Sequence, residues 1–320
     1  MRTLVTGITG FVGGHLAEHL LACGDEVIGC SRAGRWPDEL RHLSDRIDLI
    51  PCDLTQETSA LALFEKRQFD AVIHLAGLAN PRACEAAPPE AERQNSWVTA
   101  LLISAMRTSG QRLRLLMVST SYVYATPDPT GLPIRSDSPL EPDTIYGKTK
   151  LKAESAAADD GTDNRLDIVR VRPFNHIGPR QHEGYIVANW TRQIAAIERG
   201  HAPPILRVGN LDSRRDYTDV RDVVRAYRLL IEHGGRGEVY NLGSGTSRSG
   251  REILEVLRRL SRVPWDFESD PARVRPNEAY EIVADATPLR VATGWRPEID
   301  FEATLRDTLD YWRSNEKGLE

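Results

Sequence analysis

Short apolar runs alternate with helix-like stretches through the first half of the chain. Runs rich in Val, Ile and Leu predict buried strands, and apolar residues spaced three or four apart predict amphipathic helices. Strands are expected over residues 3–6, 26–30, 48–51, 71–75, 113–119 and 167–172, and helices over residues 12–23, 61–67, 91–109 and 146–159. This alternation predicts right-handed βαβ units in a doubly wound parallel sheet of the α/β class.

The second half of the chain is less regular. Turn signals such as Gly178-Pro179 and Pro203-Pro204 multiply after Pro173, which is typical of a smaller lobe built from short elements. We therefore expect one domain over residues 1–173 and a second lobe over residues 174–320. A strand at 238–242 and a helix at 250–261 are expected to return to the main sheet, so that the two units interleave.

Composition narrows the classes of partner. The 320 residues carry 41 Lys and Arg against 46 Asp and Glu, a net charge of −5, so no basic excess favours nucleic acid or an anionic membrane. No apolar run reaches the roughly 18 residues of a membrane span, and the first residues lack a signal-peptide pattern. Four scattered cysteines form no C-x-x-C pair. We expect a cytoplasmic protein with reduced thiols.

A glycine motif follows the first strand. Gly7, Gly10 and Gly13 lie between this strand and the first helix, the context in which such a triplet binds a dinucleotide. Gly7 would allow the tight turn, Gly10 the approach of a pyrophosphate, and Gly13 the packing of helix on strand. The helix N-terminus would attract the anion with free N–H groups and a positive dipole.

The end of the second strand favours NADP(H) over NAD(H). An NAD site usually has an acidic residue there, which accepts hydrogen bonds from the ribose. Here Ser31 and Arg32 occupy the position, with Arg35 close behind. The side chains of Ser31 and Arg32 can bind a 2′-phosphate. NAD(H) remains the alternative. Further along, Asp53-Leu54 would contact the adenine, and Leu75-Ala76-Gly77 would pass close to the cofactor.

Tyr146 and Lys150 are the sharpest candidates for chemistry. They are four residues apart on a predicted helix and therefore share one face. A nearby ammonium would lower the pKa of the phenol from its usual value near 10, which suits an acid or base at neutral pH. Hydroxyl residues end the strand before this helix, where sites form at a parallel sheet's carboxyl edge; they are Ser119, Thr120, Ser121, Tyr122 and Tyr124.

The segments TGITGFVGG, HLAG, STSYVY, YGKTK and RPFN together resemble the extended short-chain dehydrogenases over essentially the whole chain. The resemblance implies a Rossmann domain, a small lobe for a sugar nucleotide, and a homodimer formed through a helix bundle. It also implies that Thr120, Tyr146 and Lys150 are catalytic, whereas Asn95 is at best a structural or relay residue. The expected cofactor-binding set is Gly7, Gly10, Phe11, Val12, Gly13, Ser31, Arg32, Asp53, Leu54, Leu75, Ala76, Gly77, Tyr146, Lys150 and Pro173.

The second half is similar to the GDP-mannose-derived branch of this family, and most of all to reductases that convert GDP-4-keto-6-deoxy-D-mannose into GDP-D-rhamnose. That likeness rests on residues 172–179, 192–195, 209–212 and 215–217. Arginine is also the side chain suited to bidentate binding of a diphosphate. The expected substrate-binding residues are Thr120, Ser121, Asn175, Asn189, Arg192, Arg215 and Arg275.

One departure separates the reactions within the family. Related 4,6-dehydratases need an Asp-Glu pair after the catalytic threonine, but this chain has Ser121-Tyr122. We therefore expect an NADPH-dependent 4-keto reductase in which Tyr146 protonates the C4 oxygen and Thr120 stabilises it. A 4-epimerase or 4,6-dehydratase with tightly bound NAD(P) stays open, as do the substrate's base and the product's configuration at C4.

Two readings come from other classes of protein. Residues 15–19 match the zinc-peptidase pattern H-x-x-E-H, although their position on the phosphate-binding helix favours a solvated face, and no metal is expected. The second is a Rossmann module that binds cofactor without turnover. The complete set of Thr120, Tyr146 and Lys150 argues against such a sensor.

Overall fold

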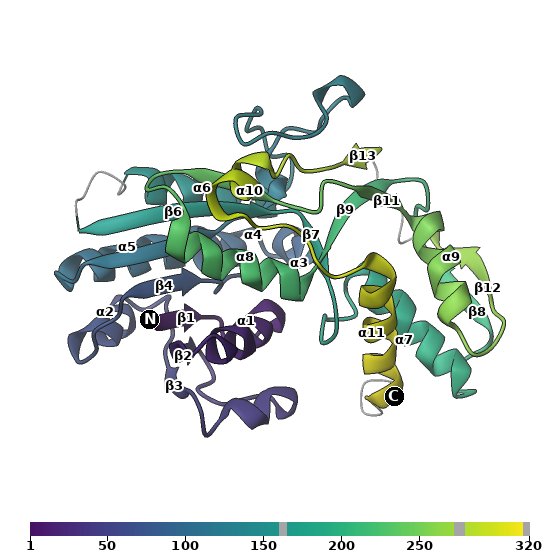
Figure 1. Ribbon diagram of the computed structural model, residues 1–320, viewed down its shortest axis with the longest axis horizontal. Helices are drawn as coiled ribbons and strands as arrows, with labels where there is room; N and C mark the ends of the chain where they lie inside the picture. Colours follow the sequence, from purple (N-terminus) through teal and green to yellow (C-terminus); the bar gives the residue numbers. More distant parts are fainter. Residues whose placement is uncertain (160–164, 272–278, 316–320) are drawn as a thin grey trace.

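The computed structural model describes residues 1–159, 165–271 and 279–315, which form a large lobe and a smaller one beside it (Figure 1). The large lobe is built on a seven-stranded sheet in which every neighbouring pair is parallel. In spatial order its strands are β10 (Val239–Leu242), β6 (Leu166–Pro173), β5 (Leu113–Val118), β4 (Ala71–His74), β1 (Arg2–Thr6), β2 (Glu26–Ser31) and β3 (Asp48–Pro51). The order reverses direction between β1 and β4, where a doubly wound sheet opens a crevice at its carboxyl edge.

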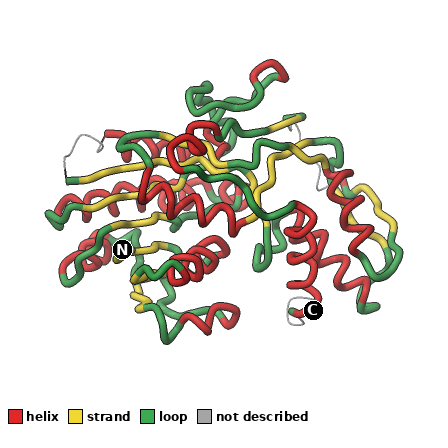
Figure 2. Tube along the Cα trace, in the orientation of Figure 1, coloured by secondary structure: helices red, strands yellow, loops and turns green. Residues whose placement is uncertain are grey.

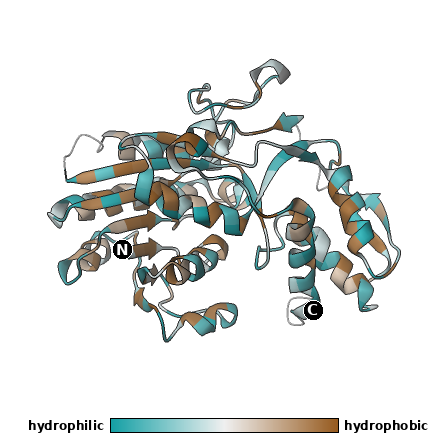
Figure 3. Cartoon of the chain, viewed as in Figure 1, coloured by the Kyte–Doolittle hydropathy of each residue, from teal (hydrophilic) through white to brown (hydrophobic). Residues whose placement is uncertain are grey.

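Helices cover both faces of this sheet, because its central strands are apolar on both sides. On one face Leu16, Tyr227 and Leu289 pack against the sheet from three helices: α1 (Phe11–Ala22), α8 (Val220–His233) and α10 (Thr287–Thr293). On the other face the core residues Leu63, Leu102 and Ala153 come from α2 (Glu57–Glu65), α5 (Val98–Thr108) and α6 (Ile145–Asp159). Figure 3 shows apolar residues concentrated along the central strands.

The helix expected over residues 91–109 is not α-helical throughout. It begins as α4 (Pro88–Ala91), passes through the π-helical turn η2 (Glu92–Trp97) and continues as α5 to Thr108. Such a π turn often marks a functional site, and this one carries Asn95. The other short helices are α3 (Pro81–Ala86) and the 3₁₀ turns η1 (Asp38–Leu43), η3 (Ser121–Val123) and η4 (Pro129–Gly131).

The smaller lobe has its own core, in which Trp190, Leu257 and Trp312 pack together. These residues come from α7 (Ile186–Glu198), α9 (Gly250–Leu260) and α11 (Phe301–Ser314). Short strands complete the lobe as one four-stranded and one two-stranded sheet (Figure 2). They are β7 (Asn175–Ile177), β8 (Ile205–Val208), β9 (Arg214–Asp219), β11 (Ser247–Ser249), β12 (Asp266–Ser269) and β13 (Glu281–Ile282).

The chain crosses between the lobes more than once. Strand β10 pairs with β6 at the edge of the main sheet, as expected for residues 238–242. The expectation that the following helix also returns is wrong, because α9 buries Ile253 and Leu257 in the core of the small lobe. Conversely, α8 and α10 come from the second half of the sequence but pack on the large lobe. Among the described residues, no helix has the length and hydrophobicity needed to cross a membrane.

Candidate active site

A cavity of about 1370 Å³ extends from the carboxyl edge of the main sheet to the small lobe. It is lined by Gly7, Thr120, Tyr146 and Arg215, which come from both halves of the chain. Every other residue of the expected cofactor and substrate sets lines it too, except Arg275, which lies outside the described residues. The fold therefore brings the predicted residues together in one space.

The glycine loop forms one end of this cavity. Gly7 has φ 70° and faces the backbone of Ala76, and a Cβ on Gly7 would lie 2.9 Å from the Ala76 nitrogen. A Cβ on Gly13 would lie 2.4 Å from the Gly7 oxygen and 2.6 Å from Ile8 Cα, so only glycine allows α1 to pack this closely. Gly10 precedes α1, and no side chain caps the free N–H groups of the helix. This cradle fits a pyrophosphate.

The second and third strands end beside the same region. Ser31 ends β2, and the exposed Arg32 follows it in the cavity wall, whereas Arg35 is exposed outside that wall. Asp53 Oδ1 accepts hydrogen bonds from Thr55 N at 3.0 Å and Thr55 Oγ1 at 2.8 Å. Burial raises the pKa of Asp53, but these bonds outweigh it and hold the pKa below its usual value. The wall therefore offers a cation, a hydroxyl and a carboxylate to a nucleoside.

Tyr146 lies near the N-terminus of α6 and is 9% exposed. Its phenol shares a hydrogen bond with the side chain of Thr120, the residue that precedes η3. Burial raises the pKa of Tyr146 above its ordinary value, and the Thr120 hydrogen bond only partly opposes this. The expectation of a lowered pKa is therefore wrong, because burial of the phenol is the largest influence on its pKa. The phenol keeps its proton at neutral pH and is suited to act as an acid.

Lys150 is also buried, and its ammonium donates a 2.6 Å hydrogen bond to the carbonyl oxygen of Val118. Burial lowers the pKa of Lys150 to about 8, although Glu154 and Cys84 oppose that shift. His74 is neutral beside it, because burial and then the Lys150 charge lower the His74 pKa to about 3. Lys150 is thus a cation that titrates close to neutral pH.

The π turn connects two parts of the site. Asn95 accepts a hydrogen bond from Leu78 N at 2.8 Å and donates to Leu78 O at 3.2 Å and Thr149 Oγ1 at 3.0 Å. A Cβ on Gly77 would lie 2.7 Å from Asn95 Oδ1, which explains the glycine after β4. Asn95 therefore fixes the loop after β4 against the catalytic helix, a structural role.

Four of the expected substrate residues line the cavity where the small lobe begins. Asn175 lies in β7, Asn189 and Arg192 lie in α7, and Arg215 lies in β9. Arg192 pairs with Glu183 at 2.7 Å. Arg215 Nη1 donates to the backbone oxygens of Arg214 at 2.8 Å and Ala279 at 2.9 Å. These contacts hold both guanidinium groups at the cavity wall.

Two tyrosines outside the expected binding sets also belong to this site, and sequence reasoning missed Tyr185 altogether. Tyr122 packs edge-on against Tyr146, with ring centroids 5.7 Å apart. Tyr185, just before α7, donates a hydrogen bond to Ala79 O at 3.3 Å and so joins the small lobe to the loop after β4. Both line the cavity. Tyr122 stood in the quoted STSYVY segment, whereas no periodic signal marked Tyr185.

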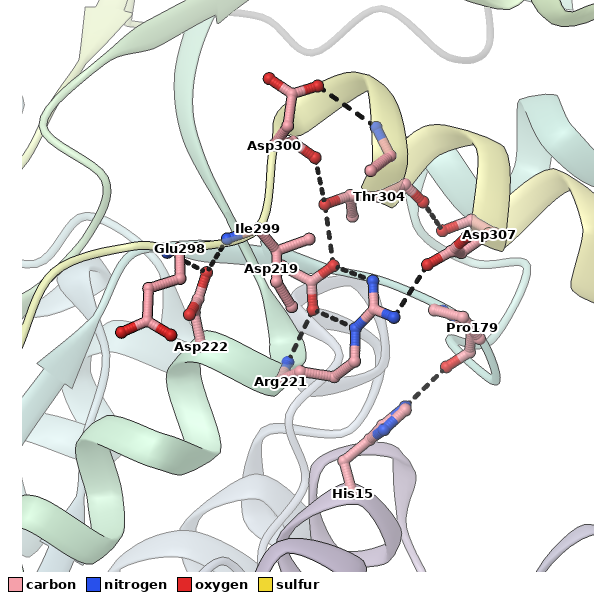
Figure 4. A network of polar contacts seen from close by, with 12 residues as sticks. His15, Pro179, Asp219, Arg221, Asp222, Glu298, Ile299, Asp300, Thr304 and Asp307 are labelled. Atoms are coloured by element: carbon pink, nitrogen blue, oxygen red, sulfur yellow. Dashed lines mark hydrogen bonds and ion pairs between the residues drawn. The ribbon is translucent and has the colours of Figure 1, made fainter.

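Two of the H-x-x-E-H residues, His15 and Glu18, contact the turn at 178–181, and Figure 4 shows the contact of His15 with Pro179. His15 Nε2 makes a 2.9 Å hydrogen bond to Pro179 O, and Glu18 receives two hydrogen bonds from Arg180, at 2.7 and 2.6 Å. Within residues 1–159, 165–271 and 279–315, no group of three or more His, Cys, Asp or Glu side chains is arranged to hold a metal ion. This helix therefore ties the glycine-loop region to the turn at 178–181.

Comparison with known proteins agrees with this geometry. Residues 4–308 match the family model described as GDP-mannose 4,6-dehydratase. The chain is 34% identical to GDP-6-deoxy-D-mannose reductase of Pseudomonas aeruginosa, over 98% of this chain and 97% of that protein. It is 29% identical to UDP-glucose 4-epimerase of Mycolicibacterium smegmatis, over 98% and 99%.

A solved structure extends the similarity to three dimensions. The structure of RMD from Pseudomonas aeruginosa complexed with NADPH superposes with a TM-score of 0.85 and 33% identity, covering 98% of this chain and 99% of that one. Both the sequence match and the superposition span the two lobes and the cavity between them. The chain therefore belongs to the GDP-mannose 4,6-dehydratase family, within the extended short-chain dehydrogenases.

Proposed function

We propose that this protein is an NADPH-dependent reductase of a nucleotide-linked 4-keto-6-deoxy sugar, with GDP-4-keto-6-deoxy-D-mannose as substrate and GDP-D-rhamnose as product. The observation that carries the proposal is the environment of Tyr146. After burial, the side chains with the largest influence on the pKa of its phenol are Thr120, Tyr185, Tyr122 and Cys84, and these four include no carboxylate. A protonated acid with a hydroxyl partner suits reduction of a ketone, whereas abstraction of a carbon-bound proton needs a base.

The residues of the cavity wall support NADP(H) as the cofactor. The uncapped start of α1 and its glycines would hold the pyrophosphate, and Ser31 and Arg32 would bind the 2′-phosphate of NADP(H). The NADPH bound to the Pseudomonas relative supports this choice. NAD(H), which is bound in a UDP-glucose 4-epimerase structure of 28% identity, is the alternative. When bound, the reduced nicotinamide would supply a hydride to the carbonyl carbon.

The protein's own groups would handle the oxygen and the proton. Tyr146 would donate its proton to the C4 oxygen as negative charge develops there, and Thr120 would hydrogen-bond the same oxygen. Lys150 would hold the nicotinamide ribose and stabilise the phenolate that Tyr146 leaves behind. Asn175, Asn189, Arg192 and Arg215 would hold the nucleotide diphosphate, and Ser121 would contact the sugar. Arg275 keeps its proposed role in the nucleotide site.

Relative kcat/KM values test the substrate assignment. We expect NADPH-dependent turnover of the GDP-linked 4-keto-6-deoxy sugar at least ~10-fold above that of the UDP- and dTDP-linked analogues, since each unpaired polar contact costs about 1.4 kcal/mol or more. Equal or reversed preference would contradict the GDP assignment but leave the reductase assignment intact.

A 4-epimerase is the second candidate, supported by the 29% identical relative. An epimerase would keep an oxidised cofactor through each cycle, whereas a reductase must exchange it. Protein purified without added cofactor and assayed on UDP-glucose separates the two. Epimerisation without added NADPH would favour the epimerase.

We also infer a homodimer in the cytoplasm. Trp97 at the end of η2 is 54% exposed, and we place it in the helix bundle through which the family resemblance implies pairing. Trp97→Glu should convert the dimer into a monomer in light scattering. Val291→Glu, at a position 82% exposed on α10, is the control that should leave the mass unchanged. A monomeric parent protein would contradict the inference.

A further inference from the structure

A buried ion pair lies behind the catalytic face of α6. Arg172 Nε is 3.0 Å from Glu154 Oε1, and Arg172 Nη2 is 2.7 Å from Glu154 Oε2. Only 3% of Arg172 and 2% of Glu154 are exposed. Replacing such a pair with apolar side chains is often neutral or stabilising. The stability of the fold therefore does not by itself explain why the pair is present. The position of the pair in the site offers a reason.

The remaining donors of Arg172 continue the network away from the helix. Arg172 Nη1 donates to Tyr124 OH at 2.9 Å and to Ser136 O at 3.0 Å. Tyr124 OH donates to Asn241 Oδ1 at 2.6 Å, and Asn241 Nδ2 donates to Ile134 O at 2.9 Å. The guanidinium also lies 4.9 Å from the Tyr124 ring centroid. These side chains form one connected and fully buried polar network.

The network joins the elements that build the active site. Glu154 lies on α6 one turn beyond Lys150 and two turns beyond Tyr146. Tyr124 ends the short η3 turn that begins after Thr120. Arg172 immediately precedes Pro173 of the cavity wall, and Asn241 lies in β10. A shift of any one element would break hydrogen bonds in a buried environment, which is costly.

Glu154 also faces the charge of Lys150. Burial disfavours the ammonium, and the carboxylate of Glu154 is the first group that opposes this effect. The other groups in electrostatic contact with Lys150 are Cys84 from α3 and the neutral His74 from β4, and Tyr146 lies one turn earlier on the same helix. Among these, Glu154 is the carboxylic acid side chain, and it forms a buried ion pair with Arg172.

We propose that Glu154 is a positioning residue of the reaction, which holds the Tyr146 and Lys150 face of α6 in register with the Thr120 segment through Arg172 and Tyr124. Its charge has a second effect, because it keeps Lys150 cationic near neutral pH and so able to hold the cofactor ribose. The inference rests on the proposed roles of Tyr146 and Lys150, but its first test needs no sugar substrate.

The first test is the dissociation constant of NADPH as a function of pH, measured by cofactor fluorescence between pH 6.5 and 9.5 for the parent protein and Glu154→Gln. The amide keeps the shape of the side chain but removes its charge. We expect the midpoint at which affinity weakens to move down by about one pH unit, the shift typical of losing an opposite charge nearby. An unchanged midpoint would overturn the role of Glu154.

Two controls separate this effect from general damage. Glu92 in η2 pairs with Lys152, which lies on the exposed side of α6. Glu92→Gln removes this carboxylate and should leave the midpoint unchanged. Lys150→Met should abolish the titration step. If Glu92→Gln moves the midpoint as far as Glu154→Gln does, the specific role of Glu154 is wrong.

A second variant keeps the charge and breaks the link. Tyr124→Phe removes the hydroxyl between Arg172 and Asn241, and Glu154 stays in place. We expect kcat to fall about 10-fold while KM and the NADPH midpoint stay unchanged, because only alignment of Thr120 with Tyr146 is disturbed. A parental kcat would overturn the alignment role. Absence of keto-sugar turnover in the parent protein, with the midpoint shift present, would instead contradict the proposed function.

Discussion

The ammonium of Lys150 donates a 2.6 Å hydrogen bond to the carbonyl oxygen of Val118, at the end of β5. This contact fixes the catalytic helix to the strand that leads into Thr120. The Lys150 pKa is about 8, below its ordinary value of 10.5, because burial disfavours the charged form. The folded protein therefore releases this proton at a pH where an exposed lysine would keep it.

Cofactor binding should weaken as pH rises through about 8. Below that pH the ammonium of Lys150 can donate a charge-assisted hydrogen bond to the ribose, and above it the bond is weakened. We expect the dissociation constant of NADPH to rise about 10-fold between pH 7 and 9.5, as for the loss of a hydrogen bond to a charged group. Fluorescence titration measures it. If the dissociation constant stays the same across this range, Lys150 does not contact the cofactor.

Tyr146→Phe should lower kcat by at least ~100-fold, since general acid catalysis contributes 10²–10⁴-fold. Thr120→Val should lower it by a similar factor, because it removes a hydrogen bond to the developing oxyanion. The NADPH dissociation constant of Thr120→Val should stay within about twofold of the parental value, because Thr120 is not among the expected cofactor-binding residues. Steady-state kinetics with NADPH measures the effect. Near-parental turnover of Tyr146→Phe would remove this residue from the mechanism.

Arg32→Ala should weaken NADPH binding about 10-fold and leave NADH binding unchanged, because only NADPH carries the 2′-phosphate that the guanidinium would pair with. Arg35→Ala is the matched control. It removes a second exposed arginine of the same loop, but one outside the cavity wall. Dissociation constants for both cofactors decide the question. Equal losses for NADPH and NADH would contradict recognition of the 2′-phosphate.

Gly13→Ala should destabilise the protein by on the order of 1–3 kcal/mol, the usual cost of overpacking. Its Cβ would meet backbone atoms of Gly7 and Ile8, which cannot move as a side chain can. Gly131→Ala is the control, because its nearest contacts would be at 3.9 and 4.0 Å. Thermal unfolding of both variants measures the difference. Equal melting temperatures would show that the loop relaxes to admit the methyl group.

Asp222→Ala should cost about 2–4 kcal/mol of stability. Its buried carboxylate accepts 2.9 Å hydrogen bonds from Glu298 N and Ile299 N, where the chain leaves the large lobe for α11 (Figure 4). The variant leaves these two backbone donors without that acceptor. The control is Asp310→Ala, which removes an exposed carboxylate paired with Arg313. Urea unfolding gives both values, and equal midpoints for the two variants would contradict the account.

The sequence predicted the large lobe better than the small one, for a physical reason. Strands such as residues 71–74 and 113–118 are mostly apolar runs, because both faces of the central strands are buried, and they were found to within a residue. The strands β8 and β12 are short and partly exposed, so no hydrophobic period marks them. The helix at 250–260 was found, but amphipathicity alone could not say against which core it packs.

The residues of the candidate site also differ in how well the sequence predicted them. Gly7, Gly13, Thr120 and Tyr146 belong to motifs with fixed spacing, and all four line the cavity. The pKa of Tyr146 was mispredicted because helical spacing reveals a neighbour but not the burial that outweighs it. Tyr185 was missed because its place depends on how the small lobe folds onto the loop after β4. Such contacts between distant segments leave no local signal.

The most direct test of the central claim is NADPH absorbance during incubation with GDP-4-keto-6-deoxy-D-mannose, formed in place by a dehydratase, followed by NMR of the product. The account predicts one NADPH consumed per GDP-D-rhamnose formed, and no consumption above background with Tyr146→Phe. If NADPH is not consumed by the parent protein, or if it is consumed equally by Tyr146→Phe, the proposed reductase mechanism is wrong.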